Sequence, residues 1–293
     1  MKLNKNNKIL IVGLGLIGGS YAMCLSKKGY EVGAISLNQE DIEYAIDNKI
    51  IAHGMANVTK EYVSKFDVII FALYPKILLE WISKYKDYIK ENAILTDVTG
   101  IKKEIVYEIQ NQLSNAEYIG AHPMAGKEVY GIKNASETMF LNANYIITPT
   151  SKNTDNAIEL AISIGEELQF ANISILTPEK HDEMIAFLSQ LTHCIAISLM
   201  TCKESQHLKE YTGDSFRDLT RIASINEDMW SELFLMNKEE LLNQMDLFSE
   251  QFTKLRDYID KEDVSSIKEM MKLSTYRRSY FNKKWGIIYE YEF

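Results

Sequence analysis

The first candidate for chemistry is a histidine that follows a short apolar run and precedes a proline. His122 ends the run 118–121, and Pro123 biases the His122 backbone toward an extended conformation. The reference pKa of imidazole is about 6.5, so the ring can take up a proton near neutral pH. A strand over 118–121 would put His122 at the carboxyl end of a sheet, where ligands bind in α/β proteins. We therefore predict that His122 is a general base, although a single histidine is more often structural.

A second group of polar side chains lies on a predicted helix in the last third of the chain. Ser189 and His193 are four residues apart and share one face of that helix. His181 and His193 are twelve residues apart, or roughly 120° around a helix, so they face one site only if the helix bends. Zinc is a weaker alternative, because neither an H-E-x-x-H motif nor a cysteine cluster occurs. We predict no metal site.

Two arginines, Arg217 and Arg221, follow four residues apart. They could form two surface salt bridges, or one could grip a substrate carboxylate through both of its guanidinium nitrogens. The spacing alone leaves both interpretations open.

A glycine-rich turn near the start of the chain predicts a dinucleotide site. Gly13, Gly15 and Gly18 form G-x-G-x-x-G between an apolar run at 8–12 and a helical segment at 18–28. Gly13 permits the tight turn, Gly15 lets the backbone approach a pyrophosphate, and Gly18 lets the helix pack closely on the strand.

The rest of the nucleotide signature is incomplete. The exposed N–H groups at the start of that helix are expected to face the phosphates, and Leu16 and Ile17 of the turn are further cofactor-binding candidates. The acidic residue that binds the ribose 2′-hydroxyl is absent, because the second apolar run ends at Ser36 and Asn38. These two residues could hydrogen-bond a hydroxyl or a 2′-phosphate. These residues leave the choice between NAD and NADP open; NAD is the expected cofactor and NADP the alternative.

The elements that must position these residues form two patterns. Over the first 176 residues, apolar runs alternate with helical segments, which predicts a doubly wound α/β sheet with parallel strands. The expected strands are Lys8–Val12, Glu31–Ile35, Asp67–Leu73, Ala93–Val98, Tyr118–Ala121, Tyr145–Thr148 and Ala171–Leu176. The expected helices between them are Gly18–Lys28, Gln39–Asn48, Lys76–Ile89, Lys102–Leu113 and Asn153–Leu168.

After Thr177 and Pro178 the pattern becomes helical only, which predicts two domains at 1–177 and 178–293. The expected helices are Glu179–Lys203, a long helix that opens with a capping box at Ser224 and Glu227 and runs to about Asp260, and Val264–Asn282. An apolar stripe with coiled-coil-like spacing lies on the long helix: Leu241, Met245, Phe248, Phe252, Leu255 and Ile259. The spacing fits packing within the chain as well as a dimer seam.

Composition and charge limit the possible partners. The 293 residues are 46% hydrophobic and 25% charged, which is ordinary for a globular protein. A net charge of −9 argues against nucleic acid or an anionic membrane as a partner. We expect reduced, buried thiols at Cys24 and Cys194, no membrane span, and a cytoplasmic location.

The motifs together resemble the prephenate/arogenate dehydrogenase family of tyrosine biosynthesis. The resemblance covers about residues 8–282. It rests on G-L-G-L-I-G-G-S at 13–20, T-D-V at 96–98, H-P-M-A-G-K-E at 122–128, S-Q-L-T-H at 189–193 and D-L-T-R-I-A at 218–223. It implies a Rossmann-type dinucleotide-binding domain followed by an all-α dimerisation domain, which favours a homodimer through the C-terminal helices.

The resemblance also implies an activity, the NAD(P)-dependent oxidative decarboxylation of prephenate to 4-hydroxyphenylpyruvate. His122 would accept the proton of the ring hydroxyl, Ser189 would hydrogen-bond that hydroxyl or the histidine, and Arg221 would bind a substrate carboxylate. Further substrate-binding positions implied by the resemblance are Glu128, His193 and Trp230. Arogenate as the substrate, a non-catalytic NAD(P) sensor and a generic imine or hydroxy-acid reductase remain alternatives.

The chain departs from the family pattern at two positions. Gly100 stands where a serine is usual, and Thr99 is the neighbouring residue expected to supply a hydroxyl to the substrate. Gln190 replaces a histidine beside Ser189, which leaves one titratable group fewer.

Overall fold

The computed structural model describes residues 2–127, 129–204 and 206–282, which fold into two compact units. The first unit contains residues 2–182 and 224–236, and the second contains residues 183–223 and 237–282. The short segment 224–236 therefore belongs to the first unit, although it follows part of the second in the sequence.

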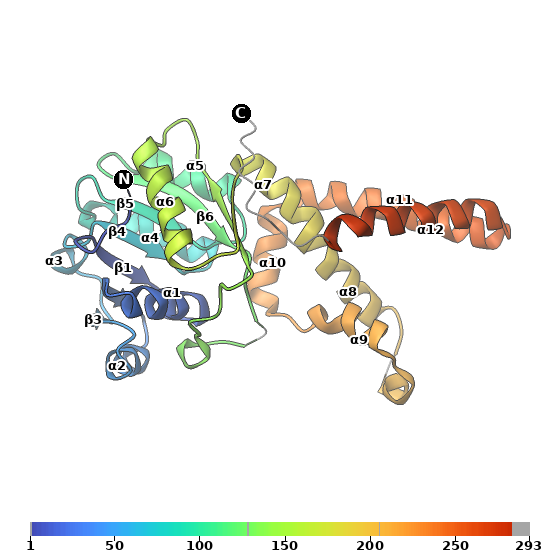
Figure 1. Ribbon diagram of the computed structural model, residues 1–293, viewed down its shortest axis with the longest axis horizontal. Coiled ribbons are helices and arrows are strands. Elements are labelled where there is room, and N and C mark those ends of the chain that lie inside the picture. Colours follow the sequence, from blue (N-terminus) through green and yellow to red (C-terminus); the bar gives the residue numbers. More distant parts are fainter. Residues whose placement is uncertain (1, 128, 205, 283–293) are drawn as a thin grey trace. The chain divides into compact units, whose positions relative to one another are not determined.

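One eight-stranded sheet organises the first unit (Figure 1). Its order is β3-β2-β1-β4-β5-β6-β7-β8. The strands are β1 (Lys8–Val12), β2 (Glu31–Ile35), β3 (His53–Met55), β4 (Val68–Phe71), β5 (Ile94–Asp97), β6 (Glu117–Pro123), β7 (Asn144–Thr148) and β8 (Asn172–Ile175). All seven strands expected from the apolar runs are present. The short strand β3 is additional, since its sequence His-Gly-Met has no apolar run.

The strand directions agree with the prediction except at one pair. β7 runs antiparallel to β6, with His122 opposite Ile146, and β8 is again parallel to β7. The expectation of parallel strands throughout is wrong for this pair, because an apolar run marks a buried strand but carries no information on its direction.

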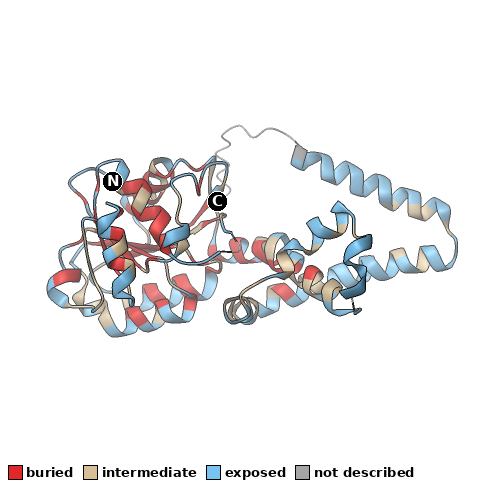
Figure 2. Ribbon diagram, turned by 90° about the horizontal axis from the view of Figure 1, so that it is seen from below, coloured by how far each residue is buried: buried red, intermediate tan, exposed pale blue. Residues whose placement is uncertain are grey.

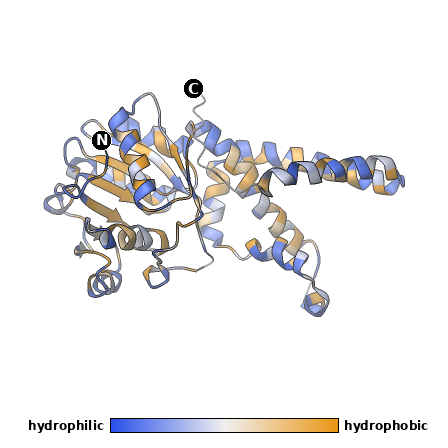
Figure 3. Cartoon of the chain, in the orientation of Figure 1, coloured by the Kyte–Doolittle hydropathy of each residue, from blue (hydrophilic) through white to orange (hydrophobic). Residues whose placement is uncertain are grey.

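Helices cover both faces of the sheet, so the central strands β1, β4 and β5 are buried on two sides, whereas the edge strands β3 and β8 are only partly buried. Ile9 and Ile11 of β1 belong to one hydrophobic cluster, whereas the alternating Leu10 and Val12 belong to the other. The helices of this unit are α1 (Leu16–Lys27), α2 (Gln39–Asp47), α3 (Lys60–Val63), α4 (Pro75–Tyr85), α5 (Lys103–Gln112), α6 (Asp155–Glu167) and α10 (Glu227–Met236). Helix α7 (Pro178–Ile185) begins in this unit and ends in the second. Buried residues concentrate in the strands and the sheet-facing sides of these helices (Figure 2), and the strands are strongly hydrophobic (Figure 3).

The strand order of the sheet changes direction at the boundary between β1 and β4. From β1 the chain proceeds outward to β2 and β3, and it then crosses to β4 on the other side of β1. Because β1, β4, β5 and β6 are parallel, their carboxyl ends meet at one edge. Gly13, Asp97 and His122 lie at this edge, which is where α/β proteins bind ligands.

The second unit is helical. Its helices are α8 (Leu191–Thr201), α9 (Asp214–Thr220), α11 (Lys238–Asp260) and α12 (Val264–Ser279). A π-helical turn at Ala186–Gln190 joins α7 to α8. The resulting helix, Pro178–Thr201, is long and apolar enough to cross a membrane by length and composition alone, with 28% of its most apolar window buried. Such a helix is weak evidence, because core and interface helices pass the same test.

The long helix expected between Glu227 and Asp260 is interrupted. Asn237 leaves the helical conformation with φ −112° and ψ 29°, and this separates α10 from α11. The cap of α10 also differs from the expected capping box, because the Asn226 side chain accepts the Met229 N–H at 2.8 Å. A break of one residue is too short to be recognised from the spacing of apolar residues, so the sequence did not predict it.

Candidate active site

The glycine turn has the geometry that a dinucleotide requires. Gly13 has φ +102°, and a Cβ there would lie 2.4 Å from the Ala72 carbonyl oxygen. A Cβ on Gly18 would lie 1.9 Å from the Gly13 oxygen, so the close packing of α1 depends on glycine. A Cβ on Gly15 would meet nothing within 4 Å. The turn therefore leaves open space at the start of α1, where a pyrophosphate can approach.

Helix α1 begins at Leu16, so the N–H groups of Leu16 and Ile17 belong to its first turn. These donors and the open face above Gly15 form a cradle that fits the pyrophosphate of NAD. At the end of β2, Ser36 is half-buried, and the Asn38 side chain accepts the Glu40 N–H at 2.9 Å. Asn38 thus caps α2, which leaves Ser36 as the better placed of the two for the ribose.

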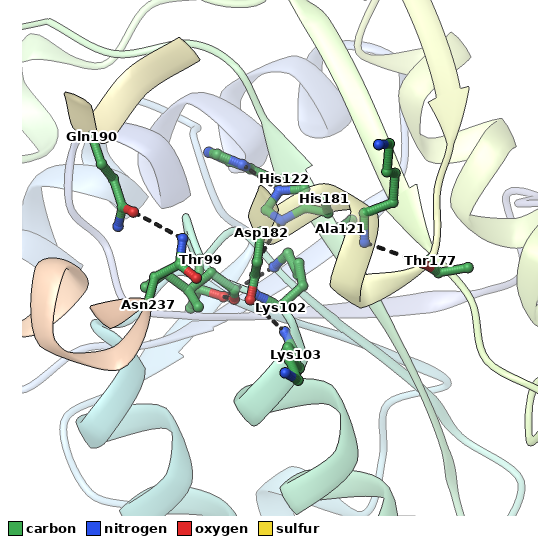
Figure 4. Close-up of polar contacts among 12 residues, drawn as sticks. Thr99, Lys102, Lys103, Ala121, His122, Thr177, His181, Asp182, Gln190 and Asn237 are labelled. Atoms are coloured by element: carbon green, nitrogen blue, oxygen red, sulfur yellow. Dashed lines mark hydrogen bonds and ion pairs between the residues drawn. The ribbon is translucent and has the colours of Figure 1, made fainter. Parts of the chain in front are cut away.

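His122 is half-buried near the carboxyl end of β6 and makes a close contact with a second histidine (Figure 4). Its Nδ1 lies 2.9 Å from Nε2 of His181, and the two ring centroids are 5.1 Å apart. Burial, together with His181 and Lys102, lowers the pKa of His122 well below 6.5. His122 is therefore neutral at physiological pH, as a general base must be.

His181 is in turn bonded to Asp182, the next residue of α7. His181 Nδ1 lies 2.7 Å from Asp182 Oδ1, and both side chains are buried. Burial lowers the pKa of His181 to about 3 and raises the pKa of Asp182 to about 6. At neutral pH the pair is therefore a neutral imidazole beside a carboxylate.

Asp182 also holds the start of α5. Its two carboxylate oxygens each accept one backbone N–H at 2.8 Å, from Lys102 and Lys103. Helix α5 has no side-chain cap of its own, so Asp182 supplies that cap from another helix.

A buried ion pair lies at the end of β5, on the same edge as His122. Lys102 Nζ and Asp97 Oδ2 are 2.5 Å apart, and the other carboxylate oxygen of Asp97 accepts the Ala121 N–H at 3.1 Å. The pair therefore fixes the residue next to His122.

Thr99 belongs to this cluster and does not present its hydroxyl to solvent. Its Oγ1 donates to Asp97 and accepts from Lys102 Nζ at 3.0 Å, and the residue is 4% exposed. The Thr99 hydroxyl is therefore already bonded inside the protein, which argues against the substrate contact predicted for it. Gly100, in contrast, borders the site: a Cβ there would lie 3.8 Å from His122 Nε2.

In the second unit, the π-helical turn places Ser189 and Gln190. The Ser189 carbonyl accepts His193 Nδ1–H at 2.9 Å, which turns the other nitrogen of His193 away from the helix backbone. Gln190 is buried, and its Oε1 accepts from Asn237 Nδ2 at 2.8 Å. Gln190 thus ties the π turn to the start of α11. The turn also breaks the regular rotation on which the comparison of His181 with His193 relied.

The two arginines have different surroundings. Arg217 is bonded to Asp214 at 2.6 Å and to the Thr212 carbonyl at 3.0 Å. Of the two interpretations, the surface salt bridge therefore applies to Arg217. Arg221 starts a short turn at residues 221–223 that packs against α8, the helix of His193. Trp230 lies on α10 and packs against Phe234, with ring centroids 5.4 Å apart. Glu128 lies outside the described residues.

No role was predicted from the sequence for three further residues of the site, Asp97, Lys102 and Asp182, and His181 was not predicted as a partner of His122. Asp97 ends a buried strand, which is a signal for a polar residue at the ligand edge. Asp182 carries no such signal, since an acidic residue in the first turn of a helix is ordinary. Among the described residues, no group of three or more histidine, cysteine or acidic side chains could hold a metal ion.

Comparison with known proteins gives consistent results. Residues 21–173 match the model of the prephenate dehydrogenase nucleotide-binding domain, and residues 177–273 match that of the prephenate dehydrogenase dimerization domain. The chain is 31% identical over 269 residues to prephenate dehydrogenase of Bacillus subtilis, covering 88% of this chain and 72% of that protein. It is 28% identical over 275 residues to cyclohexadienyl dehydrogenase of Zymomonas mobilis, covering 91% and 93%.

A solved structure is similar over nearly the whole length. It is prephenate dehydrogenase from A. aeolicus in complex with hydroxyphenyl propionate and NAD+, with a TM-score of 0.86 and 28% identity. The alignment covers 96% of this chain and 100% of that one.

Proposed function

Because the chain belongs to the prephenate dehydrogenase family, we propose that it oxidatively decarboxylates prephenate to 4-hydroxyphenylpyruvate with NAD as its cofactor. The observation that carries the proposal is the position of His122. It lies at the same sheet edge as the glycine turn, and its lowered pKa keeps it neutral at physiological pH. The name and ligands of the A. aeolicus structure, a phenolic acid and NAD+, support the same chemistry.

Bound NAD would supply the acceptor for the hydride that leaves the ring carbon carrying the hydroxyl group. Residues of the glycine turn, Gly13, Gly15 and Gly18, with the N–H groups of Leu16 and Ile17, would hold its pyrophosphate. Ser36 would bind the adenosine ribose.

His122 would do the acid–base work. The ring hydroxyl becomes more acidic as hydride departs from its carbon, and a neutral Nε2 of His122 can accept that proton. The electron pair of the breaking bond to the ring carboxylate then enters the ring, CO2 leaves and the ring becomes aromatic. The loss of CO2 and the gain of aromaticity make the step irreversible.

Further residues are proposed as substrate contacts. Arg221 would bind a substrate carboxylate, Ser189 would hydrogen-bond the reacting hydroxyl or His122, and His193 would line the pocket. Trp230 and Glu128 complete the proposed set. The contact of the Arg221 turn with α8 supports placing Arg221 and His193 in one site.

We propose that the enzyme works as a cytoplasmic homodimer. The match to a dimerization domain over residues 177–273 supports a dimer. In the single chain, three residues of the predicted stripe on α11, Phe248, Phe252 and Ile259, are 38%, 64% and 60% exposed. Large apolar side chains in such a row are costly to leave in water, so a second copy is the expected cover.

The test is a spectrophotometric assay of purified protein with prephenate or arogenate, each with NAD and with NADP. We expect cofactor reduction with prephenate and NAD. Reduction with arogenate alone would instead identify an arogenate dehydrogenase, and no reduction in any mixture would favour a protein that only binds the nucleotide.

A further inference from the structure

We propose that His181 and Asp182 are positioning residues that fix the tautomer of His122 and so leave its Nε2 free to act as the base. The inference rests on the proposed function only in giving His122 a proton to accept. It is carried by a chain of hydrogen bonds from Asp182 through His181 to His122 (Figure 4). In this chain the proton position on His181 determines the proton position on His122.

The chain starts at the carboxylate. Asp182 accepts the backbone N–H groups of Lys102 and Lys103, one on each oxygen, at 2.8 Å. An ionised carboxylate can only accept hydrogen bonds. His181 Nδ1, at 2.7 Å from Oδ1, must therefore carry the proton and donate it.

The next step follows from the neutral ring of His181. A neutral imidazole has one N–H group and one bare nitrogen. Because Nδ1 of His181 holds the proton, its Nε2 is bare and can only accept. The nitrogen 2.9 Å away is Nδ1 of His122, which must then be the donor.

The last step concerns the reacting atom. With its single proton on Nδ1, neutral His122 has a bare Nε2. This atom lies near Gly100, where an added Cβ would be 3.8 Å from it. Nε2 is thus the only basic atom that His122 can offer to a substrate hydroxyl.

A structural role for the two residues makes a different prediction. Asp182 caps α5 and His181 is buried, so either could serve packing alone. A packing role gives no reason for a particular proton position on His122. The tautomer therefore separates the two accounts.

The first experiment reads the tautomer directly. Protein labelled with ¹⁵N in its five histidines is examined by NMR without substrate, at a pH above the pKa of Asp182. The signals are assigned by single substitutions such as His53→Gln and His207→Gln. We expect His122 to show a protonated Nδ1 and a bare Nε2, and His181 the same. A protonated Nε2 on His122 would overturn the proposal.

The second experiment uses a matched pair of variants. His181→Phe keeps a ring against His122 but removes the acceptor, whereas His181→Gln keeps an acceptor near the position of Nε2. We expect kcat to fall roughly 10- to 100-fold in His181→Phe, as for other partners that orient a functional histidine, with KM little changed. His181→Gln should recover much of that loss, and His53→Phe is the control for removing a distant hydrogen-bonded histidine.

The outcomes separate this inference from the proposed function. Equal kcat values for His181→Phe and His181→Gln, or an unchanged His122 tautomer in His181→Phe, would overturn it. If His181→Phe does not fold, the tautomer of His122 in the wild type and in His181→Gln still tests the proposal. A protonated Nδ1 in both would support it, and a protonated Nε2 in the wild type would overturn it. An inactive wild-type enzyme would refute the proposed function but would not alter the NMR result.

Discussion

Lys102 and Asp97 form an ion pair that is closed to solvent, with Nζ 2.5 Å from Oδ2 and no exposed surface on either side chain. The pair links the end of β5 to the start of α5. Through the Ala121 N–H it also fixes the backbone beside His122. Stability and the position of the proposed base therefore depend on the same two charges.

Removing the cation should be costly. In Lys102→Met the Asp97 carboxylate stays buried without its partner, and we expect a loss of about 3–5 kcal/mol in the free energy of unfolding. Lys28→Met, which breaks a partly exposed pair with Glu167, should cost no more than about 1 kcal/mol. Urea unfolding of both variants checks the difference, and similar losses would contradict the assigned role.

Two glycines should respond to the same substitution to different extents. In Gly18→Ala the new Cβ would overlap the Gly13 carbonyl oxygen, so we expect a loss of about 1–3 kcal/mol and weaker binding of NAD. In Gly100→Ala the nearest atoms are 3.8 Å away, so stability should change by no more than about 1 kcal/mol. Thermal unfolding and calorimetric titration with NAD measure both effects. A clear loss of stability in Gly100→Ala would contradict the open space around Gly100.

His122→Asn should remove the base but leave the fold intact. We expect kcat to fall roughly 10²–10⁴-fold, the usual contribution of a general base, with little change in substrate affinity. Circular dichroism establishes folding, and His53→Asn is the control. Wild-type turnover in the folded variant would remove His122 from the mechanism.

Activity should persist below the ordinary pKa of histidine. The base works in its neutral form, and burial with His181 and Lys102 lowers the pKa of His122. As pH falls, kcat/KM should therefore remain high through 6.5 and decline only as pH passes the lowered value, with an apparent pKa that belongs to the coupled group. An acid limb at or above about 6.5 would indicate an unperturbed base.

Arg221→Gln should act mainly on substrate binding. A hydrogen bond to a charged group contributes about 1.5–3 kcal/mol, so we expect KM to rise roughly 10- to 100-fold with a smaller change in kcat. Arg217→Gln is a close control, because Arg217 is engaged with Asp214 and Thr212. If both variants behave alike, another group must hold the carboxylate.

Much of the fold could be predicted because buried parallel strands leave long apolar runs, as β1, β4 and β5 do. The features that were missed depend on tertiary contacts. The direction of β7 follows from its pairing with β6, and the break at Asn237 does not disturb the apolar spacing of α10 and α11.

The residues of the candidate site that could be predicted are those that lie at the end of a strand. The glycine turn follows β1, and His122 lies near the end of β6. The contact between His122 and His181 joins residues 59 apart in the sequence, and no spacing rule connects them. The internal bonds of Thr99 could not be predicted either, because only the folded chain brings the three partners of its hydroxyl together.

The most direct test of the central claim is the stoichiometry of the reaction. Purified enzyme is mixed with prephenate and NAD, and the CO2 released is measured together with the reduced cofactor and 4-hydroxyphenylpyruvate. We predict equal amounts of all three products from the wild type and almost none from His122→Asn. Cofactor reduction without CO2 release, or no reduction by the folded wild type, would contradict the assignment.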